Sequence, residues 1–317
     1  MNKIFGNGIT VQDVVDAVSL SGYPLQTEVS NSLKEKFYVQ EEWTYLDADT
    51  DSSRSMDILA KKRLWDIKGE QPFVRPSLCL LIECKKSEVP YVFFISEGNV
   101  GTYDFPAIAG LRSNTVAIKT DDAPHTWNEH VFSVLGLGNH KFLIDTPYHC
   151  MTFSKCVRKG QKVVLSGDEP YNSIILPLIK ATEHYQKIEK PVDTARYYDL
   201  DLVIPIAVVN APLVGAKKDS SGNDEIIELD WVRVYRHTYK ESDDKFSNQK
   251  MVACDIVSSK FLSEYLEEHV KPFAEKLAEH AQKHHEVLAK SKAFVSGLNK
   301  MFPGNLEPHI QKKKGLF

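Results

Sequence analysis

The chain has 317 residues, 42% of them hydrophobic and 26% charged, which is enough apolar material for one large core or two ordinary ones. Its formal net charge of −4 excludes a general electrostatic attraction to nucleic acid, so phosphate binding would need a local group of residues or a metal ion. No segment approaches the roughly 20 consecutive apolar residues of a membrane-spanning helix, so we expect no membrane partner.

Two helices are predicted at the start of the chain. Thr10 and Asp13 form a capping box for a helix through "VQDVVDAVSLSG". Pro24 opens the second helix, in which Glu28 lies on the border of the predicted buried stripe. The apolar residues of that stripe recur every fourth position: Leu25, Val29 and Leu33.

From Phe37 the hydrophobic period changes from helical to alternating, which predicts strands. Residues 37–48 and 55–64 fit two half-buried strands joined by a turn-rich connection, and "SLCLLIECKK" and "VPYVFFISEG" fit two more apolar ones. In the second strand Asp57 is expected on the face opposite to its apolar neighbours, which are Met56, Ile58 and Ala60.

Residues 98–167 mix Gly, Pro, His and short apolar runs without a helical period, which indicates an inserted or elaborated β-rich subregion. A helix through 168–188, a strand, a hairpin and a further strand follow. A long helix is then expected from Ser258 or Ser259 to about Ser291, interrupted near Pro272. We therefore expect an α/β fold with a mixed central β-sheet flanked by helices, a single domain over 1–291 and a C-terminal tail over 292–317.

The end of the third strand carries the strongest chemical signal. In "LCLLIECKKS" the residues Glu83 and Lys85 are two apart and point to one side of the strand, while Cys84 points to the other. If the strand of Asp57 lies alongside, its carboxylate joins them. Two carboxylates and one ammonium group at a sheet edge are costly unless a cation binds there.

Phosphodiester hydrolysis gives such a group a purpose. Mg²⁺ or Mn²⁺ is held by one or two carboxylates and phosphate oxygens, and it lowers the pKa of a bound water. Asp57, Glu83 and the backbone carbonyl of Cys84 are the predicted metal ligands, and Lys85 is the predicted group that positions the water. Glu28 is a further candidate ligand, and Lys86 and Lys180 are candidate phosphate contacts.

These residues resemble the motif of the restriction-endonuclease-like superfamily, the PD-(D/E)xK nucleases. Glu28 lies on an N-terminal helix, Asp57 stands in "RSMDILA", and "IECKK" carries Glu83 and Lys85. Met56 stands where the motif has proline, and the helix after Lys85 lacks the QxxxY pattern of the exonuclease branch.

The resemblance covers about Val11 to Val209, apart from the subregion at 98–167. It implies a core of helix, three strands, helix and strand. It also implies metal-dependent cleavage of nucleic acid, DNA more than RNA, in defence against foreign DNA or in repair, with catalytic roles for Asp57, Glu83 and Lys85.

Several alternatives stay open. Asp57 and Lys85 could form a simple cross-strand ion pair with Glu83 turned to solvent, and Lys180 could be an ordinary surface lysine. The fold could serve as a catalytically silent binding module within a larger assembly, with a protein partner or a second copy of the chain. An enzyme acting on nucleotides is the third possibility.

Other candidate sites have weaker support. The five cysteines are scattered without a CxxC pair, so neither disulfides nor a zinc site are expected. His280 and His284 have ligand-like spacing, but their helix is charged and a solvated face is the better interpretation. The N-terminus lacks the pattern of a signal peptide, so a cytoplasmic location is expected.

Overall fold

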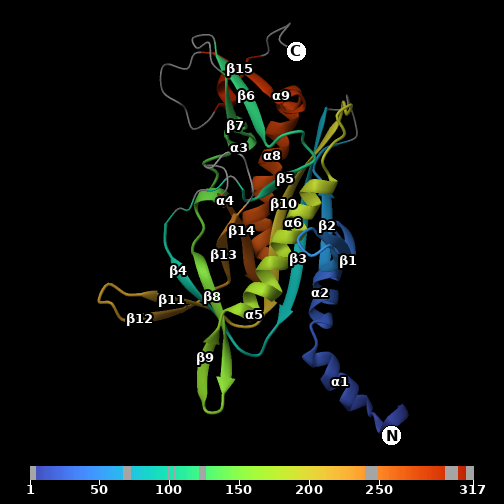
Figure 1. Ribbon diagram of the computed structural model, residues 1–317, viewed down its shortest axis with the longest axis vertical. Coiled ribbons are helices and arrows are strands. Elements are labelled where there is room, and N and C mark those ends of the chain that lie inside the picture. The colour runs from blue at the N-terminus through green and yellow to red at the C-terminus, as the bar shows by residue number, and fades with distance from the viewer. Residues whose placement is uncertain are drawn as a thin grey trace.

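A computed structural model describes residues 5–66, 73–98, 100, 102, 104–120, 126–239, 249–296 and 306–311. It is a mixed α/β structure in which a 12-stranded mixed sheet is flanked by helices, beside a separate 3-stranded sheet (Figure 1). The predicted fold class is confirmed at this level. The basic end of the expected tail, residues 312–317, lies outside the described residues.

The first part of the chain forms two helices and an antiparallel three-stranded edge of the sheet, as predicted. Both halves of the capping box between Thr10 and Asp13 are present, and Pro24 lies in the first turn of the second helix. The elements are α1 (Val11–Leu20), α2 (Tyr23–Lys34), β1 (Tyr38–Asp47), β2 (Ser52–Arg63) and β3 (Val74–Lys86).

The sheet continues beyond β3 through a parallel strand. β10 (Tyr198–Asn210) pairs with the whole length of β3, from Tyr198 opposite Val74 to Asn210 opposite Lys86. Strands buried on both faces need continuous apolar runs, and both strands have them. Further strands follow in the order β14 (Gln249–Ser258), β13 (Trp231–Tyr239), β8 (His149–Lys159), β4 (Tyr91–Ser96), β11 (Leu213–Lys218) and β12 (Asp224–Glu228).

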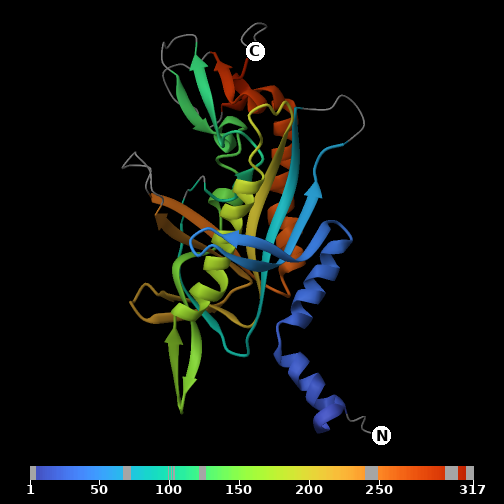
Figure 2. The same ribbon diagram turned by 45° about the vertical axis from the view of Figure 1, so that its right-hand side comes forward.

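Helices cover both faces of the part of the sheet that contains β3 and β10 (Figure 2). α6 (Leu176–Ile188) packs on one face, while α2 and α8 (Lys271–Lys283) pack on the other. Each face buries its own hydrophobic cluster, so side chains that alternate along β3 enter two different cores.

Both long helices contain a π-helical turn just before a proline. α5 (Asp168–Pro170) leads through a π-helical turn (Tyr171–Ile175) into α6, where Pro177 lies in the first turn. A proline ring clashes with the carbonyl four residues earlier, and a wider turn relieves that clash. The predicted helix over 168–188 is confirmed with this local irregularity.

The C-terminal helix begins later than predicted. Ser258 and Ser259 are still bound to neighbouring strands, and the helix starts at α7 (Leu262–Glu264) after a cap at Phe261. A second π-helical turn (Tyr265–Val270) precedes Pro272, where the interruption was expected. After α8 a short last helix, α9 (His285–Lys290), completes this part of the chain.

The region over 98–167 is not one separate subregion, because its strands join two different sheets. β8 is an internal strand of the main sheet, whereas β6 lies between β15 and β7 in the small sheet. Residues 292–295, expected in a tail, form β15. The elements are β5 (Ala107–Ala109), β6 (Thr115–Thr120), β7 (Trp127–His130), α3 (Val131–Val134), α4 (Lys141–Ile144), β8, β9 (Lys162–Ser166) and β15 (Lys292–Val295).

Three segments project from the body at the end of the sheet where β3 terminates: α1, the β8–β9 hairpin and, further to one side, the β11–β12 hairpin (Figure 1). None of the helices in the described part of the chain is long and apolar enough to cross a membrane.

Candidate functional site

The pairing of β2 with β3 places Asp57 beside Glu83, as the sequence predicted. Ile58 lies opposite Ile82 in the antiparallel register, and one further step brings Asp57 to Glu83. The Asp57 Oδ2 atom accepts a hydrogen bond of 2.7 Å from the backbone N–H of Cys84. This bond fixes the Asp57 carboxylate at the carboxyl end of β3.

Glu83 and Lys85 form an ion pair on the same side of β3. The Lys85 Nζ and Glu83 Oε1 atoms are 2.5 Å apart, and Glu83 is only 7% exposed. The alternative in which Glu83 turns to solvent is therefore wrong. A buried glutamate with a single lysine partner is a charged group that water does not stabilise.

The surroundings of these carboxylates oppose their ionisation. Burial, followed by repulsion from Asp57, raises the pKa of Glu83 to about 7, although Lys85 pulls it down. Burial also raises the pKa of Asp57, and the Cys84 N–H and the Lys85 charge offset only part of this effect. Glu42 adds a further repulsive contribution to both pKa values. The group therefore has an excess of negative charge once Glu83 ionises.

Glu42 and Gln26 also belong to this group, although neither was among the predicted site residues. Glu42 has a left-handed backbone with φ of 51°, and the regular pairing of β1 with β2 is interrupted between Glu41 and Trp43. Gln26 of α2 donates its side-chain Nε2 to Glu42 Oε1 at 2.7 Å and to the freed backbone carbonyl of Asp57 at 3.2 Å. A strained residue held by a specific partner is typical of functional sites.

The interruption at Glu42 changes which faces the strands present. Glu41 bonds to Ser30 of α2, whereas Trp43 packs against rings of α6 on the opposite face. On β2, likewise, Met56 belongs to the α6 cluster and Ile58 to the α2 cluster. The prediction that Met56 and Ile58 share a face is therefore wrong, because the strand pair turns over at Asp57.

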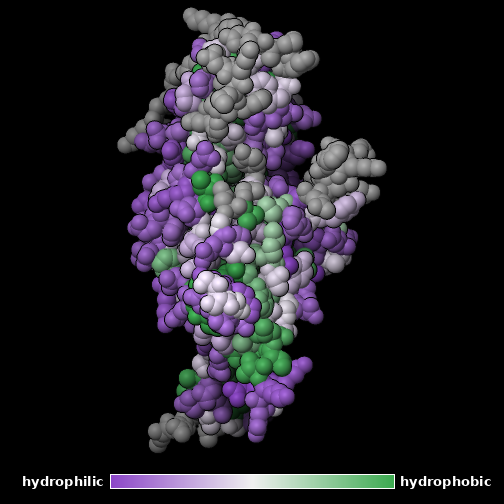
Figure 3. Space-filling model, turned by 90° about the vertical axis from the view of Figure 1, so that its left-hand side faces the viewer, coloured by the Kyte–Doolittle hydropathy of each residue, from purple (hydrophilic) through white to green (hydrophobic). Residues whose placement is uncertain are grey.

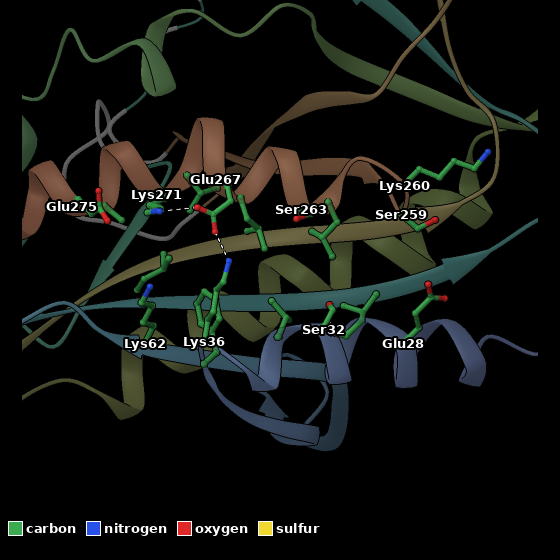
Figure 4. A pocket seen from close by; sticks show the side chains of 18 of the residues that line it. Glu28, Ser32, Lys36, Lys62, Ser259, Lys260, Ser263, Glu267, Lys271 and Glu275 are labelled. Atoms are coloured by element: carbon green, nitrogen blue, oxygen red, sulfur yellow. Dashed lines mark hydrogen bonds and ion pairs between the residues drawn. The ribbon is translucent and has the colours of Figure 1, made fainter.

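Glu28 does not contact Asp57 or Glu83 through any hydrogen bond or ion pair of the described residues. It lines a different cavity, of about 210 Å³, between α2 and α8, together with Ser259 and Lys260 (Figure 4). Lys36, Glu267 and Lys271 form an ion-pair chain across the same cavity. The helix α2 therefore reaches the carboxylate group through Gln26, and the expected role of Glu28 finds no support in this geometry.

The two lysines predicted to contact phosphate have other partners. Lys86 donates to the backbone carbonyl of Ser19, near the end of α1. Lys180 forms an ion pair with Asp49 of the β1–β2 turn at 2.5 Å and lies 3.6 Å from Glu183. Of the three predicted lysines, Lys85 is therefore the one that lies beside the carboxylates.

The donor set suits a weakly chelated hard cation more than a closed metal cage. In the described part of the chain no three His, Cys, Asp or Glu side chains gather closely enough to hold a metal ion by themselves. Mg²⁺ commonly uses one or two carboxylates and takes its other ligands from water and substrate phosphate. Asp57 and Glu83 supply that number, and their mutual repulsion is the feature that a cation would relieve.

His280 and His284, by contrast, do not lie on a solvated face. His284 is 8% exposed and its Nε2 lies 2.9 Å from Glu307 Oε1, while His280 Nδ1 lies 2.6 Å from the Leu135 carbonyl. The prediction of a solvated helix face is wrong there, because residues far along the chain pack over that helix. Both histidines already have partners.

Part of the missed geometry had a signal in the sequence. Gln26 precedes Val29 by three positions and follows Leu25, so it falls on the buried stripe of α2. Glu42 stands opposite Asp57 if the hairpin register is extended from the Tyr38–Lys61 pair. The interruption at Glu42 itself has no such signal.

Comparisons with known proteins identify no relative: no family model, no curated protein and no solved structure matches this chain.

Proposed function

We propose that the chain is a metal-dependent nuclease that hydrolyses phosphodiester bonds in DNA and uses Mg²⁺ or Mn²⁺. The observation that carries the proposal is the group of half-buried Asp57, buried Glu83 and half-buried Lys85 at the carboxyl end of β3, in which the pKa of Glu83 is raised to about 7. Strongly perturbed carboxylates with a specific charged partner are concentrated at functional sites.

The order of elements supports a restriction-endonuclease-like core. α2, the three antiparallel strands β1, β2 and β3, the helix α6 and the parallel strand β10 follow one another in the order that the sequence resemblance implied. Ligands of open α/β sheets bind outside the carboxyl ends of the strands. Glu83 and Lys85 lie at that end of β3.

Each residue of the group has a role in this proposal. Asp57 and Glu83 hold the cation, and the Cys84 N–H orients the Asp57 carboxylate. Lys85 positions the attacking water and stabilises the negative charge that develops on the phosphate. Gln26 is a positioning residue, since it holds Glu42 and the backbone of Asp57. A bound Mg²⁺ lowers the pKa of its water and neutralises phosphate charge.

The direct test measures degradation of circular duplex DNA, linear duplex DNA, single-stranded DNA and RNA with Mg²⁺, for the wild type and for Glu83→Gln. We expect cleavage by the wild type, abolished by EDTA, and no cleavage by Glu83→Gln. The matched control is Glu28→Gln, which removes one carboxylate from the separate cavity and should cleave normally. Because Glu83 must be ionised to hold a cation, cleavage should rise with pH through about 7.

A catalytically silent binding module is the second candidate, favoured by the pairing of Glu83 with Lys85 and of Asp57 with the Cys84 N–H. Absence of cleavage on every polymer, with no rise in melting temperature on adding Mg²⁺ or Mn²⁺, would favour this module over the nuclease. Release of phosphate or nucleotide from free nucleotides alone would instead favour a small-molecule hydrolase.

A further inference from the structure

The β8–β9 hairpin is the most strongly cationic projection of the described chain. Its residues 149–166 contain four Lys or Arg residues and no Asp or Glu: Lys155, Arg158, Lys159 and Lys162. Arg158, Lys159 and Lys162 are exposed, and no ion pair of the described residues involves them. Such a segment differs sharply from the chain as a whole, whose net charge is −4.

The cations are gathered at the tip by the register of the hairpin. Lys159 lies directly opposite Lys162, and Arg158 opposite Val163. Gly160, with φ of 60°, makes the two-residue turn that closes the hairpin. Like charges placed directly opposite each other destabilise a strand pair, so this arrangement favours an anionic partner at the tip.

The base of the hairpin is bonded to the connection that follows β3, the strand that carries Glu83 and Lys85. The N–H of Cys156 bonds to the carbonyl of Pro90 at 2.9 Å, and Pro90 is only five residues after Lys85. The other end of the hairpin leads through Gly167 into α5 and α6, the helix that covers the Glu83 face of the sheet. Lys155 is held at this base by Glu169, at 3.4 Å.

The dimensions of the hairpin fit a duplex groove. Five residues on each strand, from Lys155 paired with Ser166 to Lys159 paired with Lys162, extend it by roughly 17 Å at about 3.4 Å per residue. The major groove of B-DNA is about 12 Å wide and admits a two-stranded ribbon, whereas the major groove of A-form RNA is too narrow to be read. Figure 1 shows that this ribbon extends away from the body of the protein.

The hairpin also offers apolar contacts beside its charges. Val163 and Leu165 on β9 are 60% and 48% exposed. Hydrophobic residues gather above the hydrophilic lower end of the molecule when it is viewed from the side of β11 and β12 (Figure 3). Apolar side chains of groove-binding proteins contact thymine methyl groups or base edges, while neighbouring cations bind phosphates.

We propose that the β8–β9 hairpin is a DNA-binding arm that enters the major groove of duplex DNA, with Arg158, Lys159 and Lys162 on the phosphates, and holds the duplex against the end of β3. This arm would hold the substrate of the nuclease proposed above, so the inference rests on that function. The experiment nevertheless measures DNA binding in the absence of cleavage.

The test uses the full chain carrying Glu83→Gln, which cannot cleave, and a fluorescein-labelled DNA duplex of about 24 base pairs, just over two helical turns. Binding is followed by fluorescence anisotropy at several salt concentrations in EDTA. The variant is Arg158→Gln/Lys159→Gln/Lys162→Gln. The matched control removes the same residue types from exposed positions in the last turn of α6 and in the connection from α6 to β10: Lys187→Gln/Lys190→Gln/Arg196→Gln.

We expect the hairpin variant to bind duplex DNA at least ~10-fold more weakly at ~0.1 M salt, with a slope of log affinity against log salt that is shallower by about 2 to 3. The control should keep the affinity and slope of its parent. Melting curves check that both variants are folded, which the exposure of the changed residues favours.

Three results would overturn the arm: equal weakening by the control, no weakening by the hairpin variant, or equal binding of A-form duplex RNA and duplex DNA. A change of oligomeric state in light scattering, with DNA affinity unchanged, would also overturn it and make the hairpin an interface between copies.

A failure of the proposed nuclease function gives a different result. Mg²⁺-dependent cleavage by the wild type would then be absent, while hairpin-dependent DNA binding would persist.

Discussion

Two groups of charged residues in the main sheet differ in whether their charges are balanced. Arg233 and Asp255 lie on neighbouring strands, β13 and β14, and both are completely buried. Arg233 donates to both Asp255 oxygens at 2.7 and 2.9 Å and to the Phe142 carbonyl at 2.7 Å. Tyr265 donates its hydroxyl to Asp255 at 2.6 Å. The charges of Arg233 and Asp255 therefore cancel, and both side chains have hydrogen-bond partners.

The group at the end of β3 is neither neutral nor complete. Glu83 and Asp57 share one lysine, Glu42 adds a further repulsion, and the pKa of Glu83 is raised to about 7. Glu83 and Asp255 are both buried, at 7% and 0% exposed, but the charges around them are balanced only at Asp255. The Arg233–Asp255 pair is complete and acts as a structural contact, whereas at the end of β3 a cation would relieve the repulsion between the carboxylates.

The largest expected effect comes from breaking the complete pair. Arg233→Met leaves the Asp255 charge buried without its cation and removes the guanidinium that stacks on Phe105 at 4.2 Å. We expect the free energy of unfolding to fall by about 3–5 kcal/mol, measured by urea denaturation. The double variant Arg233→Met/Asp255→Leu should recover most of this loss, and a double variant as unstable as the single one would contradict the structural role.

Glu83→Gln should act in the opposite direction. The pKa of Glu83 in the folded protein, about 7, lies above its ordinary value of 4.5, so its contribution to stability is present below pH 4.5 and is lost as pH rises through 7. The variant avoids that loss. In EDTA it should be more stable than the wild type at pH 8 by up to about 3 kcal/mol and nearly equal at pH 4.5.

Urea denaturation at the two pH values measures this difference. The control is Glu28→Gln at the same pH values, since Glu28 lines the separate cavity. A Glu83→Gln protein that is less stable than the wild type at pH 8 would show that the Glu83–Lys85 ion pair stabilises the fold, and the contrast with Asp255 would then disappear.

An intermediate loss of stability is expected from a third charged group, which lies between the sheet and α6. Lys61 Nζ and the Tyr185 hydroxyl each lie 2.8 Å from Asp201 Oδ2, and Asp201 is fully buried. The other oxygen, Oδ1, has no hydrogen-bond partner among the described residues. Lys61→Met should therefore cost about 2 kcal/mol in urea denaturation, and Tyr185→Phe less. A larger cost for Tyr185→Phe would assign the main support of Asp201 to the hydroxyl.

The smallest effect is expected for Glu28→Gln. Glu28 is exposed on the wall of the cavity between α2 and α8 and has no ion pair within the described residues. Its stability should stay within about 0.5 kcal/mol of the wild type, and metal-dependent cleavage should be unchanged. Loss of cleavage in this variant would bring Glu28 back as a metal ligand and would require α2 to move in the presence of DNA.

The local elements could be read from the sequence because their signals are local. The capping box at Thr10, the stripe on α2, the alternation along β1 and the apolar runs of β3 and β10 each specify structure within a few residues. The pairing of Glu83 with Lys85 follows from the same short-range geometry, since residues two apart share a face of a strand.

The remaining features depended on segments that are distant in the chain. Three features join residues far apart in sequence: the pairing of β8 with β13, the second sheet formed by β6, β7 and β15, and the packing of Glu307 against His284. The reversal of faces at Glu42 lets Glu41 bond to α2 while Trp43 packs on α6, which is a match between elements distant in the chain. No local pattern encodes that match.

The sequence by itself therefore determined the class of fold and the chemical content of the candidate site: two carboxylates and a lysine at the end of a buried strand. Tertiary structure decided which residue of α2 reaches that site, that Glu42 joins it, and that the base of the β8–β9 hairpin bonds to the connection after β3. The reason is physical: side-chain periodicity fixes the face of an element, but only packing between elements fixes which faces meet.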